Sequence, residues 1–244
     1  MRALSGSEIL AIWETGWGRH AVDQALTVLS VALGAAPQEF AALSVGERDA
    51  LLLAVREATF GPELKGFAEC GTCAERLEFA VPLAGVRVMA PAEAAARTHE
   101  VVADGVTLRF RLPDSHDLGA IEGCADVDDG RRRLVERCVL EISRDGEPAS
   151  CSQLSDAVLA SLAARMGELD PQGEVLLDLR CTACGHAGPM LLDIATFLWA
   201  ELTVQAKRLL REVHALARAY AGSEADILAM SAWRRRCYLE MAGA

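Results

Sequence analysis

The chain has 244 residues, of which 52% are hydrophobic, so it is too apolar for a disordered protein and long enough for one large or two small domains. Its 24 Lys and Arg against 35 Asp and Glu give a net charge of −11. Because this charge repels phosphate backbones and anionic lipid, we expect neither nucleic acid nor a membrane as a default partner.

No apolar run in the sequence approaches the roughly 20 residues of a membrane-spanning helix. The first residues include Arg2, Glu8 and Glu14 and contain no uninterrupted apolar segment, so they lack the pattern of a signal peptide. We therefore expect a cytoplasmic protein, in which thiols stay reduced. The eight cysteines then indicate metal binding or burial in the core rather than disulfides.

Residues 1–66 have the pattern of an N-terminal helical region. Capping boxes begin at Ser5 and at Ser44, each with Glu three residues later and apolar residues at helical spacing behind it. Between them, residues 21–33 form a further apolar-periodic run that Gly34 ends. The sequence therefore predicts a series of helices before the first cysteine pair.

Residues 67–193 alternate between strand and helix signals. The most specific signal is Asp104-Gly105 between two alternating segments, which predicts a β-hairpin because both turn residues tolerate a positive φ. Further strands are predicted at 76–81, 174–179 and 190–194, and helices at 118–124, 127–142 and 154–169.

Residues 194–244 form a C-terminal region that is again helical. A run over 196–220 contains no Gly or Pro and predicts one long helix, which Gly222 is expected to stop. Ser223 and Ser231 are expected to cap two shorter helices. Taken together, these elements predict an α+β fold that is mostly α-helical, with helical ends around a central region.

Two Cys-x-x-Cys pairs carry the strongest chemical signal. Cys70 and Cys73 form the first pair, Cys181 and Cys184 form the second, and each pair lies beside a predicted strand. Such a turn presents two sulfurs that can reach one Zn²⁺ at about 2.3 Å, and two facing turns make the tetrahedral site of a zinc ribbon. The sequence therefore predicts a split zinc ribbon that holds structural Zn²⁺, with a hairpin and helices inserted between its two knuckles.

Three other interpretations of these pairs remain open at this stage. Cys70-Gly71-Thr72-Cys73 is similar to a thiol redox pair, although such a pair usually opens a helix and this one precedes a strand pattern. His186 is a candidate to replace one cysteine as a ligand, and the site could also hold no metal. Catalytic zinc is disfavoured because four thiolates leave no open coordination position.

The other four cysteines, Cys124, Cys138, Cys151 and Cys237, show no paired spacing and are expected to be small buried core residues.

The chain has two runs of three arginines, at 131–133 and 234–236. Such a run on a helix usually lies on the solvent-exposed face. His214 has Arg211 and Arg218 at helical spacing but no catalytic pattern. Because no catalytic triad, phosphate loop or paired-carboxylate motif is present, we expect no enzyme and no small-molecule substrate.

Several longer motifs in the chain resemble a known group of proteins. They are the two Cys-x-x-Cys pairs and residues 43–53, 56–61, 109–113, 211–220, 223–230 and 234–239. The likeness runs from about residue 8 to residue 241. It is to baseplate hub assembly proteins and baseplate accessory proteins of contractile-tailed phages, and to their relatives in phage-derived contractile injection systems.

The resemblance implies a noncatalytic role as a chaperone or minor component in baseplate assembly, with hub or wedge proteins as partners. For the partner surface, the expected residues are an aromatic and arginine group in the last helix, Trp233, Arg234, Arg235, Arg236 and Tyr238. The alternatives are a zinc-ribbon regulatory or nucleic-acid-binding adaptor and, with less support, a thiol redox protein. Incorporation into the finished particle is compatible with a cytoplasmic place of synthesis.

Overall fold

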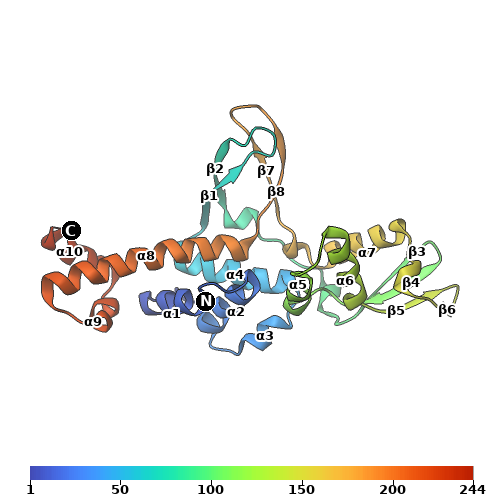
Figure 1. Ribbon diagram of the computed structural model, residues 1–244, viewed down its shortest axis with the longest axis horizontal. Coiled ribbons are helices and arrows are strands. Elements are labelled where there is room, and N and C mark those ends of the chain that lie inside the picture. Colours follow the sequence, from blue (N-terminus) through green and yellow to red (C-terminus); the bar gives the residue numbers. More distant parts are fainter. Residues whose placement is uncertain (244) are drawn as a thin grey trace.

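The computed structural model describes residues 1–243 and shows an elongated molecule in which helices form the body (Figure 1). The body contains α1 (Gly6–Gly16), α2 (Ala21–Leu33), α3 (Pro37–Ala41), α4 (Val45–Phe60) and the first half of α8 (Ile194–Tyr220). Its core is made of aliphatic side chains from these helices, including Ile12, Leu29, Leu52, Leu53, Leu198 and Leu202. The N-terminal helices and α8, at opposite ends of the sequence, thus share one core.

An ion pair between a buried arginine and a half-buried glutamate fixes α4 against α8 beside this core. Arg56 donates from Nε and Nη2 to the two carboxylate oxygens of Glu201 at 2.9 and 2.7 Å, and from Nη1 to the carbonyl of Gly61 at 2.8 Å. Arg56 is only 2% exposed, and its paired, planar contacts suit a guanidinium in such a place.

Two β-hairpins project together from one side of the body (Figure 1). The first consists of β1 (Glu63–Glu69) and β2 (Arg76–Pro82), and the second of β7 (Leu176–Arg180) and β8 (Ala187–Leu191). Each hairpin is a separate antiparallel two-stranded sheet. At their bases, Leu64 and Leu177 are buried in the core of the body, which anchors both hairpins to it.

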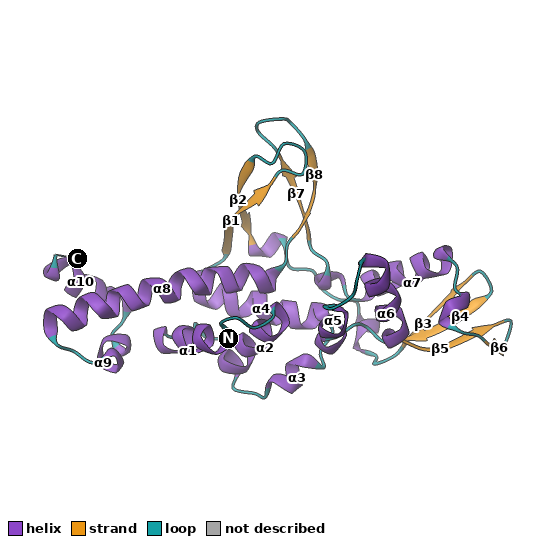
Figure 2. Cartoon of the chain, viewed as in Figure 1, coloured by secondary structure: helices purple, strands orange, loops and turns teal. Residues whose placement is uncertain are grey.

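The chain between the hairpins forms an inserted lobe at one end of the molecule (Figure 2). Its strands are β3 (His99–Ala103), β4 (Val106–Phe110), β5 (Val139–Arg144) and β6 (Glu147–Pro148), and its helices are α5 (Ser115–Ile121), α6 (Val127–Cys138) and α7 (Asp156–Leu169). The strands form one sheet of order β3-β4-β5-β6. The sheet, α6 and α7 contribute to a second core that includes Leu108, Phe110 and Leu162. Short 3-10 turns occur at η1 (Leu83–Gly85), η2 (Ala92–Ala95), η3 (Cys151–Gln153) and η4 (Pro171–Gly173).

At the opposite end, the second half of α8 extends beyond the body and carries α9 (Glu224–Ala229) and α10 (Ala232–Ala242) at its tip (Figure 1). A small core of Val213, Leu216 and Ile227 joins them to α8. Within the described residues, no helix is both long and apolar enough to cross a membrane.

The structure confirms the capping boxes at Ser5 and Ser44 and the hairpin at Asp104-Gly105, where φ is 50° and 72°. The predicted helix over 127–142 is wrong in its last turn: α6 ends at Cys138, and β5 begins at Val139 because its apolar residues pair with β4. The long helix ends at Tyr220 as predicted, but its left-handed C-cap is Ala221, with a φ of 52°, and not Gly222. The short α3 and the strand β1 were not predicted.

Polar contacts join the body to the inserted lobe at the first turn of α4. Gly46 donates its backbone N–H to Asp170 Oδ2 at 2.8 Å, and Arg48 donates to Asp49 and to Ser115 Oγ. A β-carbon at Gly46 would lie 2.0 Å from Asp170 Oδ1 and 2.8 Å from the backbone nitrogen of Gly173. Only glycine therefore allows the chain to approach this closely.

Inside the lobe, the buried carboxylate of Asp117 gathers three chain segments. It accepts from both Nη atoms of Arg111 at 2.6 and 2.8 Å, from Arg137 Nε at 2.7 Å and from the Asp114 backbone N–H at 3.0 Å. Burial alone would raise the pKa of Asp117, but these hydrogen bonds outweigh it and hold the pKa well below its usual value. The carboxylate thus ties α5 to the end of β4 and to α6.

We predict that Gly46→Ala lowers the free energy of unfolding by about 1–3 kcal/mol, because the added methyl group meets Asp170 and the backbone of Gly173. Chemical denaturation measures this loss. Gly119→Ala is the matched control, since Gly119 lies in α5 with no atom within 4 Å of an added β-carbon. It should be neutral or slightly stabilising, and an equal loss in both variants would contradict the close approach at Gly46.

We predict that Asp117→Asn lowers the free energy of unfolding by about 2–3 kcal/mol, because Arg111 and Arg137 lose a shared charged acceptor. Since the folded pKa of Asp117 is lowered, its contribution is complete above the unfolded pKa near 4 and is lost as the pH falls further. Denaturation curves of both proteins should converge in acid. Asp129→Asn is the control, because it removes the exposed ion pair with Arg132 and should change the free energy of unfolding very little. If the wild type stays more stable than Asp117→Asn in acid, the stabilising role assigned to the Asp117 carboxylate is contradicted.

Candidate metal centre

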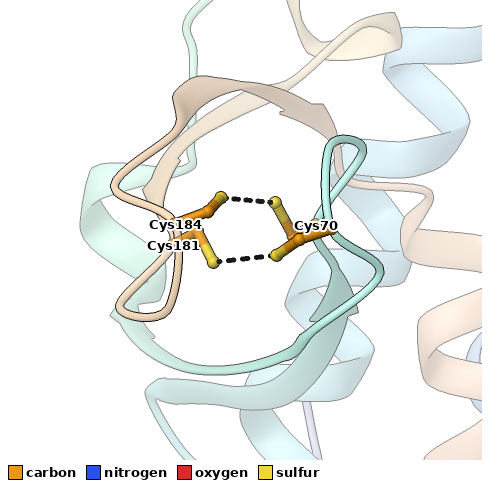
Figure 3. Close-up of side chains that lie close together, drawn as sticks. Cys70, Cys181 and Cys184 are labelled. Carbon is orange, nitrogen blue, oxygen red and sulfur yellow. Dashed lines mark hydrogen bonds between the residues drawn. The ribbon is translucent and has the colours of Figure 1, made fainter.

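The four predicted cysteines meet where the tips of the two hairpins face each other (Figure 3). Cys70 Sγ lies 3.7 Å from Cys184 Sγ, and Cys73 Sγ lies 3.6 Å from Cys181 Sγ. All four sulfurs lie within 4.8 Å of one another. Four sulfurs around a zinc ion at about 2.3 Å form a tetrahedron with edges of about 3.8 Å, so the observed spacing fits such an ion.

The two turns that present these sulfurs have the same backbone hydrogen bonds. Cys70 N donates to the carbonyl of Glu75 at 2.9 Å, and Cys181 N donates to that of His186 at 2.8 Å. In each turn, the residue after the second cysteine also donates back to the carbonyl of the first, at 2.9 Å. These residues, Ala74 and Gly185, have φ of 58° and 75°. The hairpins therefore carry two copies of one turn.

Burial within each pair follows the same order. Cys70 and Cys181 are buried, whereas Cys73 and Cys184 are exposed. The apolar cluster beneath the sulfurs consists only of Cys70, Cys181 and Leu77, with Ala68 and Leu179 packed against it. Because so little apolar surface is available at the tips, a bound ion would be the main interaction between them.

Backbone N–H groups and the neighbouring sulfurs set the protonation of the cluster. The N–H groups of Thr72 and Cys73 lower the pKa of the Cys70 thiol to about 6. The Glu75 N–H lowers the pKa of Cys73, but Cys184, burial and the other thiols outweigh it and raise that pKa to about 12. The free cluster therefore keeps part of its protons, and binding of an ion to four thiolates must release them.

The geometry disfavours the alternative interpretations of the cysteine pairs. The turn from Cys70 to Cys73 lies between two strands and does not begin a helix, so it lacks the helix N-terminus that lowers a redox thiol's pKa. His186 contributes its backbone carbonyl to the second turn, and the group of close ligand atoms in residues 1–243 consists of the four cysteines. Four sulfurs complete a tetrahedral shell, which is the pattern of a structural site.

The remaining cysteines are not part of this cluster. Cys138 is buried as expected, and its thiol lies 3.7 Å from Asp117 Oδ2. Burial raises the pKa of Cys138 to about 12, so it is a poor nucleophile. Full burial was wrong for Cys124, Cys151 and Cys237, which are half-buried.

The expected partner surface in α10 divides into exposed and buried residues. Trp233 is 76% exposed, Arg234 lies over the Tyr238 ring at 5.8 Å, and Arg236 pairs with Glu240. Arg235 differs from its neighbours: it is 6% exposed and donates to Glu212 at 3.1 Å and to the carbonyl of Met230 at 2.7 Å. It holds α10 against α8, so the expectation that it belongs to the exposed surface is corrected.

Sequence reasoning missed the residues of α8 that support this surface. Tyr220 lies against Tyr238 with ring centroids 5.4 Å apart, and Glu212 receives both Arg235 and Arg208. In the sequence, the position of Glu212 four residues after Arg208 indicates an ion pair within the helix. This spacing does not reveal the contact between Glu212 and Arg235, which depends on the turn through α9.

The sequence is similar to a known protein family. The family model for the T4 bacteriophage base plate protein matches residues 22–199, which span α2 to α4, both hairpins, the inserted lobe and the start of α8. No curated protein and no solved structure matches the chain significantly. Because the match covers well over half of its length, the chain belongs to the T4 bacteriophage base plate protein family.

Proposed function

We propose that this protein is a noncatalytic, zinc-stabilised assembly factor or minor structural component of the baseplate of a phage-like contractile injection system. Membership of a baseplate family supports a place in that assembly. The proposed stabilisation by zinc rests on one observation, that four cysteine sulfurs from two distant segments of the chain lie close together.

The proposed metal role is structural. Cys70, Cys73, Cys181 and Cys184 would hold one Zn²⁺ with no open coordination position, and the two hairpins together would act as a split zinc ribbon. The ion would crosslink the two segments through which the chain enters and leaves the inserted lobe. This crosslink would fix the orientation of the lobe relative to the helical body, and a rigid assembly component requires such a fixed orientation.

The proposed partners are hub or wedge proteins of the baseplate, contacted through the exposed part of α10. Trp233, Arg234 and Tyr238 combine a large aromatic surface with a cation, which is the composition of interface hot spots. Arg235 would act indirectly by fixing α10 in place.

A regulatory or nucleic-acid-binding zinc-ribbon adaptor is the alternative. It has weaker support because the overall charge is −11 and the hairpins carry Glu63, Glu69 and Glu78 as well as basic residues. The turn geometry likewise gives a thiol redox protein little support.

We predict about one zinc ion per purified chain, measured by elemental analysis, and its loss in Cys181→Ser. A metal present at a thousand times its Kd stabilises the folded state by about 4 kcal/mol, so the variant should unfold at clearly lower denaturant concentration. Zinc binding should release protons and weaken as the pH falls, because the cluster must give up thiol protons.

Cys237→Ser is the matched control for this experiment, since Cys237 is half-buried and lies in α10, far along the chain from the hairpins. It should keep its zinc. Zinc well below one ion per chain, together with unchanged stability of Cys181→Ser, would refute the proposed structural zinc site.

We predict that Trp233→Ala weakens co-purification with hub or wedge proteins by about 30-fold in affinity, the loss of about 2 kcal/mol that defines a hot spot. Trp17→Ala is the matched control, because Trp17 is 62% exposed at the end of α1 and lies outside α10. If both variants recover the partners as well as wild type does, this part of α10 is not the contact surface.

A further inference from the structure

The outer face of α8 carries a regular row of basic residues. Lys207, Arg211, His214 and Arg218 recur at intervals of four, three and four residues, and all four are exposed. We call these four residues the basic stripe. They lie on the side of the helix opposite its buried face, which is formed by Leu198, Leu202, Ala206, Leu209, Val213 and Leu216. At 1.5 Å per residue, the stripe extends for about 16 Å along the helix.

The charge of the basic stripe is not neutralised within the described chain. None of its members forms a salt bridge among residues 1–243. The two acidic residues of α8 are already engaged, since Glu201 binds Arg56 while Glu212 binds Arg208 and Arg235. Like charges one turn apart repel each other, so this arrangement does not stabilise the isolated helix.

The stripe also stands out against the charge of the whole molecule. Residues 204–243 contain seven Lys and Arg against four Asp and Glu, in a chain with a net charge of −11. The exposed Val204 continues the same face by one turn towards the body. Lys207, Arg211 and Arg218 are cations at intervals of four and seven residues on one face of the helix, with His214 between them. Such a row is the charge counterpart of a helix that carries carboxylates along one face.

We infer that the basic stripe is a docking site for an acidic helix of another protein, with Asp or Glu at intervals of three and four residues. The site is separate from the exposed part of α10 and does not depend on the function proposed for it. A protein helix is favoured over nucleic acid because the remainder of the chain is strongly acidic and would repel a phosphate backbone extending beyond the stripe.

The test uses the full chain and two Ala-rich helical peptides of three heptads, one with Glu and one with Lys at every a and d position. Binding is measured by fluorescence anisotropy at low ionic strength. The Glu peptide should bind wild type at least tenfold more tightly than the Lys peptide, and added salt should weaken it. Lys207→Glu, Arg211→Glu and Arg218→Glu, combined in one variant, should lose the Glu peptide and bind the Lys peptide instead.

A second triple variant, Arg97→Glu, Arg131→Glu and Arg133→Glu, changes the net charge equally at exposed residues outside α8 and should keep the Glu peptide within about twofold. Circular dichroism confirms that both variants are folded, and the corresponding triple Gln variant of the stripe should also lose binding. Equal loss in both Glu variants, or no preference for the Glu peptide, would overturn the inference. So would tighter binding of duplex DNA, or self-association of wild type that the stripe variant abolishes.

Discussion

The structure depends on one constraint, which is that four sulfurs from two remote turns meet at one point. Cys70 and Cys184 are 114 positions apart, and Cys73 and Cys181 are 108 positions apart. The chain enters the inserted lobe just after the first hairpin and returns from it into the second. An ion bound between the hairpin tips would therefore close a loop that contains the entire lobe, and long loops gain most from closure.

Away from the four sulfurs, the lobe is held to the body by polar contacts that need close approach. Asp170 reaches the first turn of α4 because residue 46 has no side chain, and Arg48 reaches Ser115 of the lobe. Inside the lobe, Asp117 serves the same purpose for α5, β4 and α6. Body and lobe keep separate apolar cores, so these contacts and the hairpins together set their relative position.

The two surfaces that we assign to partners lie outside the segment shared with the family. The match ends at residue 199, whereas the basic stripe begins at Lys207 and α10 begins at Ala232. Both surfaces belong to the extended part of α8 and its tip, at the end opposite the inserted lobe (Figure 1). The described chain thus combines the segment matched by the family model with a C-terminal part in which basic residues outnumber acidic ones.

Much of the local structure followed from the sequence because it is encoded within a few residues. The capping boxes, the Asp104-Gly105 turn and the cysteine spacing are all of this kind. What failed depends on distant residues. Residues 139–142 form a strand only because β4 lies beside them, and Arg235 is buried only because Glu212, 23 positions away, accepts from it. Helical periodicity and charge runs carry no information about such contacts.

X-ray absorption at the zinc edge of the purified protein tests the central claim most directly. If the two turns share one structural ion, the spectrum should fit four sulfur ligands at about 2.3 Å and no nitrogen or oxygen. A purified chain without zinc, or a zinc ion with nitrogen or oxygen among its ligands, would contradict a structural site made of four cysteines.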